Sequence, residues 1–231
     1  KYYSALKSMM APVEVITPDR DFTKYPFVVA PAFQLVNNDL IRRWTDYVRN
    51  GGHLILTCRT GQKNMEGHLW QAKWDEPIYN LIGARIPRYD DLPVGVNGTV
   101  AANGRNYAWG SWGDIVEPDS GTQVLATYAD QFYKGKAAAV EHKLGKGTVT
   151  YIGVDTIDGK LEHDLLYRLY ASAGVSPANL APDFIVDWRD GFFVATNFTS
   201  NTQTIPAGAN AELLLGKRQV APGGFAVWKE R

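Results

Sequence analysis

The most reactive side chain in this sequence of 231 residues is that of its one cysteine, Cys58. Cys58 directly follows an apolar run, and hydrolases can place a nucleophile on the sharp turn after a buried strand. Such a turn needs small residues two positions before and after the nucleophile, where this chain has Leu56 and Thr60. A base is also needed, and His142 and His163 fall in an expected strand and an expected helix without an orienting pattern. The sequence therefore favours a buried or half-buried thiol over a catalytic one.

The other patterns typical of chemistry are incomplete. Residues 145–147, Gly-Lys-Gly, lack the ending of a phosphate-binding loop and lead into an expected strand. The four histidines show no paired ligand spacing, and one cysteine cannot build a thiolate zinc cluster. Glu66, Asp75 and Glu76 lie in or beside one loop, and their nearness in sequence does not set the carboxylate separation of about 5–9 Å that glycoside hydrolysis needs. We expect no catalytic residue, no cofactor and no metal.

The long loop after Cys58, residues 61–75, carries the most informative side chains. Loops of this length are often functional or lie at an interface. Cations, hydrogen-bonding groups and indole rings together suit contact with a neighbouring subunit or stacking on a sugar ring. An equally favoured alternative is that the tryptophans fold back over the edge of the sheet. The candidate contact residues are Arg59, Lys63, Glu66, His68, Trp70 and Trp74.

One β-α-β unit must position these residues. The apolar runs at residues 27–30 and 54–57 are short and lack polar alternation, which predicts strands buried on both faces. Between them, apolar residues recur on one face of a helix that Asn37 or Asn38 can cap. Cys58 then leaves the carboxyl end of the second strand, where function usually sits in open α/β sheets.

The rest of the pattern extends this unit. An apolar run at residues 13–16 predicts a further strand, and the order helix, strand, strand, helix, strand favours a mostly parallel α/β sheet flanked by helices. A clear helix is expected at residues 159–173. Residues 176–182 indicate a linker, after which only short strands follow, and this predicts a small antiparallel β-sandwich. The expected domains are residues 1–175 and 183–231.

Composition narrows the classes of function. Hydrophobic residues make up 45% of the chain and charged residues 21%, as in globular proteins with a real core. Lys plus Arg and Asp plus Glu both number 24, so the net charge of zero gives no electrostatic reason to bind nucleic acid or membranes. The chain starts inside an expected helix without an initiator Met or signal peptide. We therefore expect a fragment of a longer protein and predict no compartment.

Six segments of the chain carry a resemblance to a known family: residues 3–6, 13–18, 27–31, 51–61, 146–153 and 222–227. They resemble the middle domain of family 42 β-galactosidases. The order and spacing of these segments carry the likeness, rather than any single motif. A late segment resembles the last strand of that domain, and the final one, which ends in Pro-Gly-Gly-Phe-Ala-Val, resembles the family's small C-terminal domain.

The resemblance implies a glutamine-amidotransferase-like, Rossmann-type α/β fold without amidotransferase chemistry, which mediates trimer formation. It implies a retaining β-galactosidase as the parent, whose catalytic glutamates lie in an N-terminal (β/α)8 barrel that no part of this chain resembles. The implied partners are other copies of the chain and that barrel, with a β-galactoside contacted at most indirectly. The alternatives are a Cys58-dependent amidotransferase-like enzyme, or a carbohydrate-binding module that uses Trp70, Trp74, Trp109 or Trp112.

Overall fold

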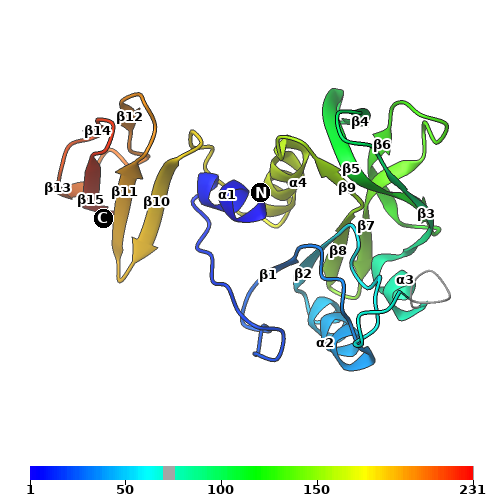
Figure 1. Cartoon of the computed structure of the whole chain (residues 1–231). Helices are drawn as coiled ribbons and strands as arrows, with labels where there is room; N and C mark the ends of the chain where they lie inside the picture. The colour runs from blue at the N-terminus through cyan, green and yellow to red at the C-terminus, as the bar shows by residue number, and fades with distance from the viewer. Residues whose placement is uncertain (70–75, 231) are drawn as a thin grey trace. The chain divides into compact units, whose positions relative to one another are not determined.

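The structure is a computed structural model that describes residues 1–69 and 76–230. The expected contact residues Trp70 and Trp74 therefore lie outside the described residues. The chain divides into two compact units. The larger comprises Ile16–Leu161, and the other comprises Lys1–Val15 together with Glu162–Arg231. Figure 1 traces the chain through both units.

The predicted β-α-β unit is present. Strand β1 (Phe27–Ala30) pairs in parallel with β2 (His53–Thr57), and helix α2 (Asn38–Arg49) connects them (Figure 1). Asn37 is the N-cap, because its Oδ1 accepts the backbone N–H of Leu40 at 2.9 Å. The apolar face of α2 is buried, as its helical periodicity predicts.

Beyond β8 the strand pairing of the sheet changes from parallel to antiparallel. β8 adds to β2 in parallel, and the strands after it pair in antiparallel fashion in the order β8-β7-β6-β4-β5-β3. The long β5 also pairs with β7 through Val116 and Ala137, so that β4, β5, β6 and β7 close into a ring. The remaining strands of this sheet are β3 (Ala84–Asp91), β4 (Gly98–Ala102), β5 (Arg105–Pro118), β6 (Gln123–Tyr128), β7 (Ala137–Leu144), β8 (Gly147–Ile152) and β9 (Val154–Thr156).

The predicted fold class is wrong. A mostly parallel, glutamine-amidotransferase-like sheet flanked by helices requires long crossovers, but among the described strands only β1–β2 and β2–β8 pair in parallel. Residues 103–104 join β4 to β5, and residues 145–146 join β7 to β8. A parallel connection needs a dozen or more residues, so turns this short force antiparallel pairing. The strand expected at residues 13–16 is also absent, since those residues form no regular element and Val15 is 87% exposed.

The helices of the larger unit cover one part of its sheet. α2 and α3 (Glu76–Ile82) contact each other and pack against β7 and β8. Gly52, just before β2, permits the ring of Tyr47 on α2 to pack closely against the backbone, because a Cβ at position 52 would lie 2.1 Å from that ring. Burying each large apolar side chain here contributes about 1.5–3 kcal/mol. None of the helices in the described residues is long and apolar enough to cross a membrane.

The other unit contains an antiparallel sheet of four strands in the order β10-β11-β15-β13, and a pair, β12 with β14. Its core includes Phe184, Val186 and Trp228. Helix α1 (Tyr2–Ser8) contacts β10, where the buried Lys7 pairs with Asp187. The predicted domain boundaries at residues 175 and 183 stay a prediction. The remaining bounds are α4 (Lys160–Ser172), β10 (Phe184–Arg189), β11 (Phe192–Asn197), β12 (Gln203–Thr204), β13 (Glu212–Leu215), β14 (Gln219–Val220) and β15 (Phe225–Lys229).

Candidate functional site

The turn that follows β2 carries Cys58 and Arg59. The backbone N–H of Cys58 donates to the carbonyl of Ile152 at 2.8 Å, which ties the turn to the end of β8. Arg59 has a φ of 69°, a left-handed conformation that costs a side chain with a Cβ about 1–2 kcal/mol. The hydroxyl of Thr60 donates to the carbonyl of Thr57 at 2.7 Å and closes the turn. The turn is therefore a rigid, hydrogen-bonded exit from the strand.

Cys58 itself is buried, with 7% of its surface exposed, beside the tyrosines Tyr128 and Tyr151. Reactive cysteines need a partly exposed, electropositive setting. The ring nitrogens of His53 and His142 instead contact the hydroxyls of Thr148 and Thr122. This setting supports the interpretation of Cys58 as a buried thiol. Within the described ranges, no three His, Cys, Asp or Glu side chains gather in a way that could hold a metal ion.

The polar centre of this region is Asp114 on β5, which is fully buried. One carboxylate oxygen accepts the Tyr151 hydroxyl at 2.6 Å and the backbone N–H of Arg59 at 3.2 Å. The other accepts the indole N–H of Trp112 at 2.8 Å. The backbone of the same residue accepts the Tyr128 hydroxyl at 2.9 Å. Asp114 thus joins the turn after β2 to strands β5, β6 and β8.

Two opposing effects set the pKa of Asp114. Burial disfavours the charged carboxylate and raises the pKa, whereas the hydrogen bonds from Tyr151, Trp112 and the Arg59 backbone lower it. Burial is the larger effect, so the pKa rises from its ordinary value of 3.8 to about 6. Burial, and after it the nearby Asp114, raise the pKa of Tyr151 well above its usual range, which keeps that hydroxyl protonated as a donor.

A stack of three side chains covers this network. The guanidinium carbon of Arg59 lies 4.6 Å from the centre of the Trp112 ring. The ring of Tyr89, on β3, stacks on Trp112 with centroids 4.2 Å apart and planes inclined by 16°. Trp112 is half-buried, and Tyr89 is exposed. A cation over an aromatic ring contributes about 0.5–1 kcal/mol at such a site.

The sequence-predicted contact residues separate into two groups. Arg59 belongs to the stack just described. The backbone N–H of Lys63 donates to the carbonyl of Gln34, and Lys63 forms isolated bridges with Leu35 and Leu69. The backbone N–H groups of Glu66 and His68 both donate to Asn64 Oδ1, which folds residues 64–68 into a tight exposed turn. The structure therefore presents Glu66 and His68 on one exposed turn.

The tryptophans proposed for sugar binding differ in access. Trp109 is fully buried, and its indole lies 5.5 Å from the ring of Tyr128, so it cannot reach a sugar from solvent. Trp112 already has Arg59 and Tyr89 over its ring. A sugar ring needs an open aromatic face, and neither residue supports the carbohydrate-binding alternative.

Sequence reasoning missed Asp114 and Tyr151, the two residues at the centre of the network. One signal was present. Asp114 stands between Trp112-Gly113 and Ile115-Val116, and a carboxylate flanked by apolar residues within a strand is either paired or protonated when it is buried. The partner itself had no local signal, because Tyr151 lies 37 positions away on another strand.

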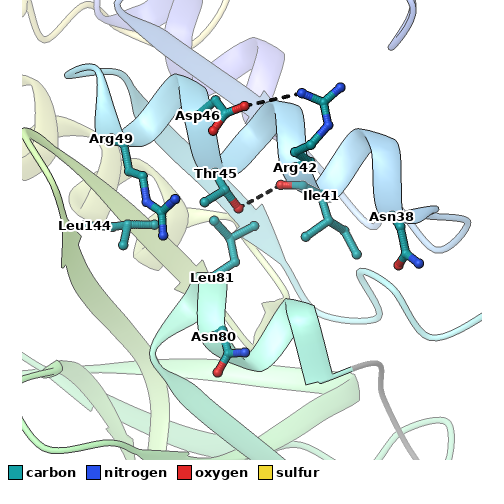
Figure 2. Close-up of a pocket in the computed structure, with 9 residues that line it drawn as sticks. All are labelled: Asn38, Ile41, Arg42, Thr45, Asp46, Arg49, Asn80, Leu81 and Leu144. Carbon is teal, nitrogen blue, oxygen red and sulfur yellow. Dashed lines mark hydrogen bonds and ion pairs between the residues drawn. The ribbon is translucent and has the colours of Figure 1, made fainter.

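A separate feature of this unit is a groove of about 340 Å³ between α2 and α3, shown in Figure 2. Ile41 and Leu81 are buried in its floor. Along α2, Arg42 pairs with Asp39 at 2.7 Å and with Asp46 at 3.4 Å, and Arg49 is exposed at the same groove. The lining residues are Asn38, Ile41, Arg42, Thr45, Asp46, Arg49, Asn80, Leu81 and Leu144.

Comparison with known proteins defines the class. Residues 1–180 match the family described as the β-galactosidase trimerisation domain. The chain is 33% identical over 220 residues to β-galactosidase BgaH of Haloferax lucentense, covering 95% of this chain and 33% of that protein. It is similar to the solved β-galactosidase of Halorubrum lacusprofundi, with 29% identity, a TM-score of 0.86, and coverage of 99% of this chain and 35% of that one. The solved β-galactosidase of Bacillus circulans sp. alkalophilus is similar with a TM-score of 0.87 and 22% identity. The match covers 100% of this chain and 36% of that one, and it shows that the two share a fold.

The chain belongs to the β-galactosidase trimerisation-domain family, because the match covers most of its length. This confirms the resemblance to family 42 β-galactosidases and the expectation of their trimerisation domain. The chain spans about a third of the length of the curated relatives that it matches.

Proposed function

We propose that this chain holds a β-galactosidase together as a homotrimer. The observation that carries the proposal is the match of residues 1–180 to a β-galactosidase trimerisation domain. The shared fold with the Halorubrum lacusprofundi β-galactosidase, at 29% identity, supports it. We propose further that the parent is a retaining β-galactosidase whose catalytic barrel is a separate, N-terminal domain. Substrate then reaches this region at most indirectly.

We also propose that the turn after β2 and the loop beyond it contact a neighbouring subunit. Arg59, Lys63, Glu66 and His68 are the contact residues of this surface. Exposed apolar side chains support the proposal, since Met65 and Leu69 in the same loop lie open to solvent. Apolar groups beside cations are typical of the side chains that subunit interfaces bury.

The proposed domain division places the assembly function in residues 1–175 and a small β domain in residues 183–231. The family match, which ends at residue 180, supports a boundary in this region. The separate core of Phe184, Val186 and Trp228 supports a distinct C-terminal domain.

Sedimentation equilibrium of the 231-residue chain tests the assembly role. We expect a mass three times the 25.6 kDa of one chain at micromolar concentration. A monomer across the whole micromolar range would overturn the proposal. The same preparation should release no galactose from an aryl galactoside, and turnover by the purified chain would overturn the non-catalytic role.

A further inference from the structure

A homotrimer with cyclic symmetry needs two different surfaces on each copy. Around a three-fold axis the contact is heterologous, so that one patch of each subunit meets another patch of the next. If the proposed trimer is correct, two complementary patches can take part in this contact, in addition to the surface after β2 proposed above. Both lie within the unit Ile16–Leu161, so they belong to one compact body.

The first patch is the turn between β3 and β4, residues 93–96. It reads Pro-Val-Gly-Val, and Val94 is 107% exposed, so its entire side chain projects into solvent. Val96 and Ile157 are also exposed and both flank Gly110, where an added Cβ would lie 3.7 Å from the Val96 carbonyl and 3.9 Å from Ile157. Val94 and Val96 make this turn an apolar projection, and Ile157 lies beside Gly110 near its base.

The projection is rigid. The backbone N–H of Val96 donates to the carbonyl of Pro93 at 2.9 Å, and Gly95 has a φ of 85°. Together they define a type II turn, whose third position needs a glycine. The backbone N–H of Leu92 donates to the carbonyl of Ser111 at 2.8 Å and fixes the base of the turn to β5. A preorganised turn loses little conformational entropy when it binds.

The second patch is the groove between α2 and α3. Its volume of about 340 Å³ lies within the range of cavities that receive compact apolar groups. Ile41, Leu81 and Leu144 give it an apolar lining. The groove also presents the exposed guanidinium of Arg49, whereas Arg42 is already paired with Asp39 and Asp46. Figure 2 shows the residues of α2 along one side of the groove and those of α3 opposite.

The two patches are complementary in polarity and in charge. The turn offers an apolar tip, and two residues before it Asp91 is an exposed carboxylate. The groove offers an apolar floor with the exposed cation of Arg49 at its side. A carboxylate beside an apolar anchor fits a guanidinium beside an apolar pocket, and such pairing sets the register of an interface.

We propose that the 93–96 turn of one copy inserts into the α2–α3 groove of the next copy, with Asp91 of the first facing Arg49 of the second. The occupant of the groove is thus a second copy of this chain. Val94 is the apolar anchor, and the Asp91–Arg49 pair orients it. The same contact repeated three times closes the ring.

The test compares two valine substitutions in the 231-residue chain by sedimentation. Val94→Asp places a carboxylate in the apolar groove, and association should weaken at least about 100-fold. Val15→Asp is the matched control, because Val15 is likewise exposed and lies in no helix or strand. It should leave the trimer intact. Equal denaturation midpoints at concentrations where both are monomeric show that both variants fold.

A charge exchange tests the groove independently. Asp91→Lys and Arg49→Glu should each weaken association about 10-fold, and the double variant should recover most of it. A wild-type chain that is monomeric overturns the proposed function and this inference together. A trimeric wild type with a trimeric Val94→Asp variant overturns only the inference. Loss of the trimer in Val94→Asp without any effect of Arg49→Glu overturns the groove as the receiving surface.

Discussion

Asp114 illustrates how a buried carboxylate is held in a core. Donors from three separate segments converge on its two oxygens, Tyr151 and the Arg59 backbone on one and Trp112 on the other. Each hydrogen bond to a charged group stabilises by about 1.5–3 kcal/mol, yet transfer of the charge out of water costs more. The pKa of about 6 shows that the cost of burial exceeds the gain from the hydrogen bonds. If the hydrogen bonds outweighed burial, the pKa of Asp114 would lie below its ordinary 3.8.

The raised pKa of Asp114 predicts a pH-dependent stability. Asp114 binds a proton more tightly in the folded state than in the unfolded state. Protonation of Asp114 therefore stabilises the folded state; this contribution is fully present below about pH 4 and is lost as the pH rises through about 6. Asp114→Asn removes this titration. Between pH 4 and 7.5, the free energy of unfolding of the wild type should therefore fall relative to that of the variant, by an amount on the order of 3 kcal/mol.

Urea denaturation of both proteins at several pH values measures this difference. All other titrating groups are shared, so the difference curve isolates Asp114, whatever constant offset the amide introduces. Difference curves that stay flat between pH 4 and 7.5 would contradict the raised pKa. A difference of the opposite sign would show that the hydrogen bonds outweigh burial.

At the residue scale, the sequence revealed only part of the site. Cys58 was correctly interpreted as buried, because an unsuitable turn is visible in the flanking Leu56 and Thr60. The Asp114–Tyr151 bond was not predictable, because it joins strands whose pairing depends on the completed sheet. The stacking of Tyr89 on Trp112 likewise follows from the antiparallel register of β3 and β5, which no local pattern specifies.

At the element scale, local periodicity predicted helices and strands well and their assembly poorly. The bounds of β1 followed from a short apolar run, and the N-cap of α2 is Asn37, one of the two asparagines that the sequence left as candidates. The direction of the later strands was misjudged, because the first three elements after the N-terminal helix fit a parallel pattern that the rest of the chain does not continue. Two-residue turns at residues 103–104 and 145–146 carry the correct signal, since only antiparallel neighbours can be joined so tightly.

The junction between α2 and β8 depends on glycine for a steric reason. A Cβ on Gly147 would lie 2.1 Å from the carbonyl oxygen of Gly52 and 2.5 Å from that of Val48, and both are backbone atoms that cannot rotate away. Gly147→Ala should therefore lower the free energy of unfolding by about 2–3 kcal/mol, as other overpacking substitutions do.

Gly110→Ala is the matched control for Gly147→Ala. Both glycines lie in strands without a left-handed φ, but a Cβ on Gly110 would come no closer than 3.4 Å to Asn97. Denaturant titration should find this variant within about 0.5 kcal/mol of the wild type. Equal losses at both positions would mean that backbone entropy, rather than the approach of α2, sets the cost.

At the scale of the whole molecule, assembly should contribute to stability. If three folded copies associate and unfolded copies do not, mass action makes the unfolding equilibrium depend on protein concentration. Each tenfold increase in concentration should stabilise one chain of a trimer by about 1 kcal/mol. For a chain of this size that corresponds to a rise in the midpoint temperature of about 2–4 °C.

Thermal unfolding followed by circular dichroism at concentrations a hundredfold apart measures this rise. The midpoint of the wild type should increase by about 4–8 °C over that range. The midpoint of Val94→Asp should stay constant, because a chain that remains monomeric has no association to gain from concentration. A wild-type midpoint that does not move would contradict assembly by this chain alone. Equal rises in both proteins would place the trimer contact outside the 93–96 turn.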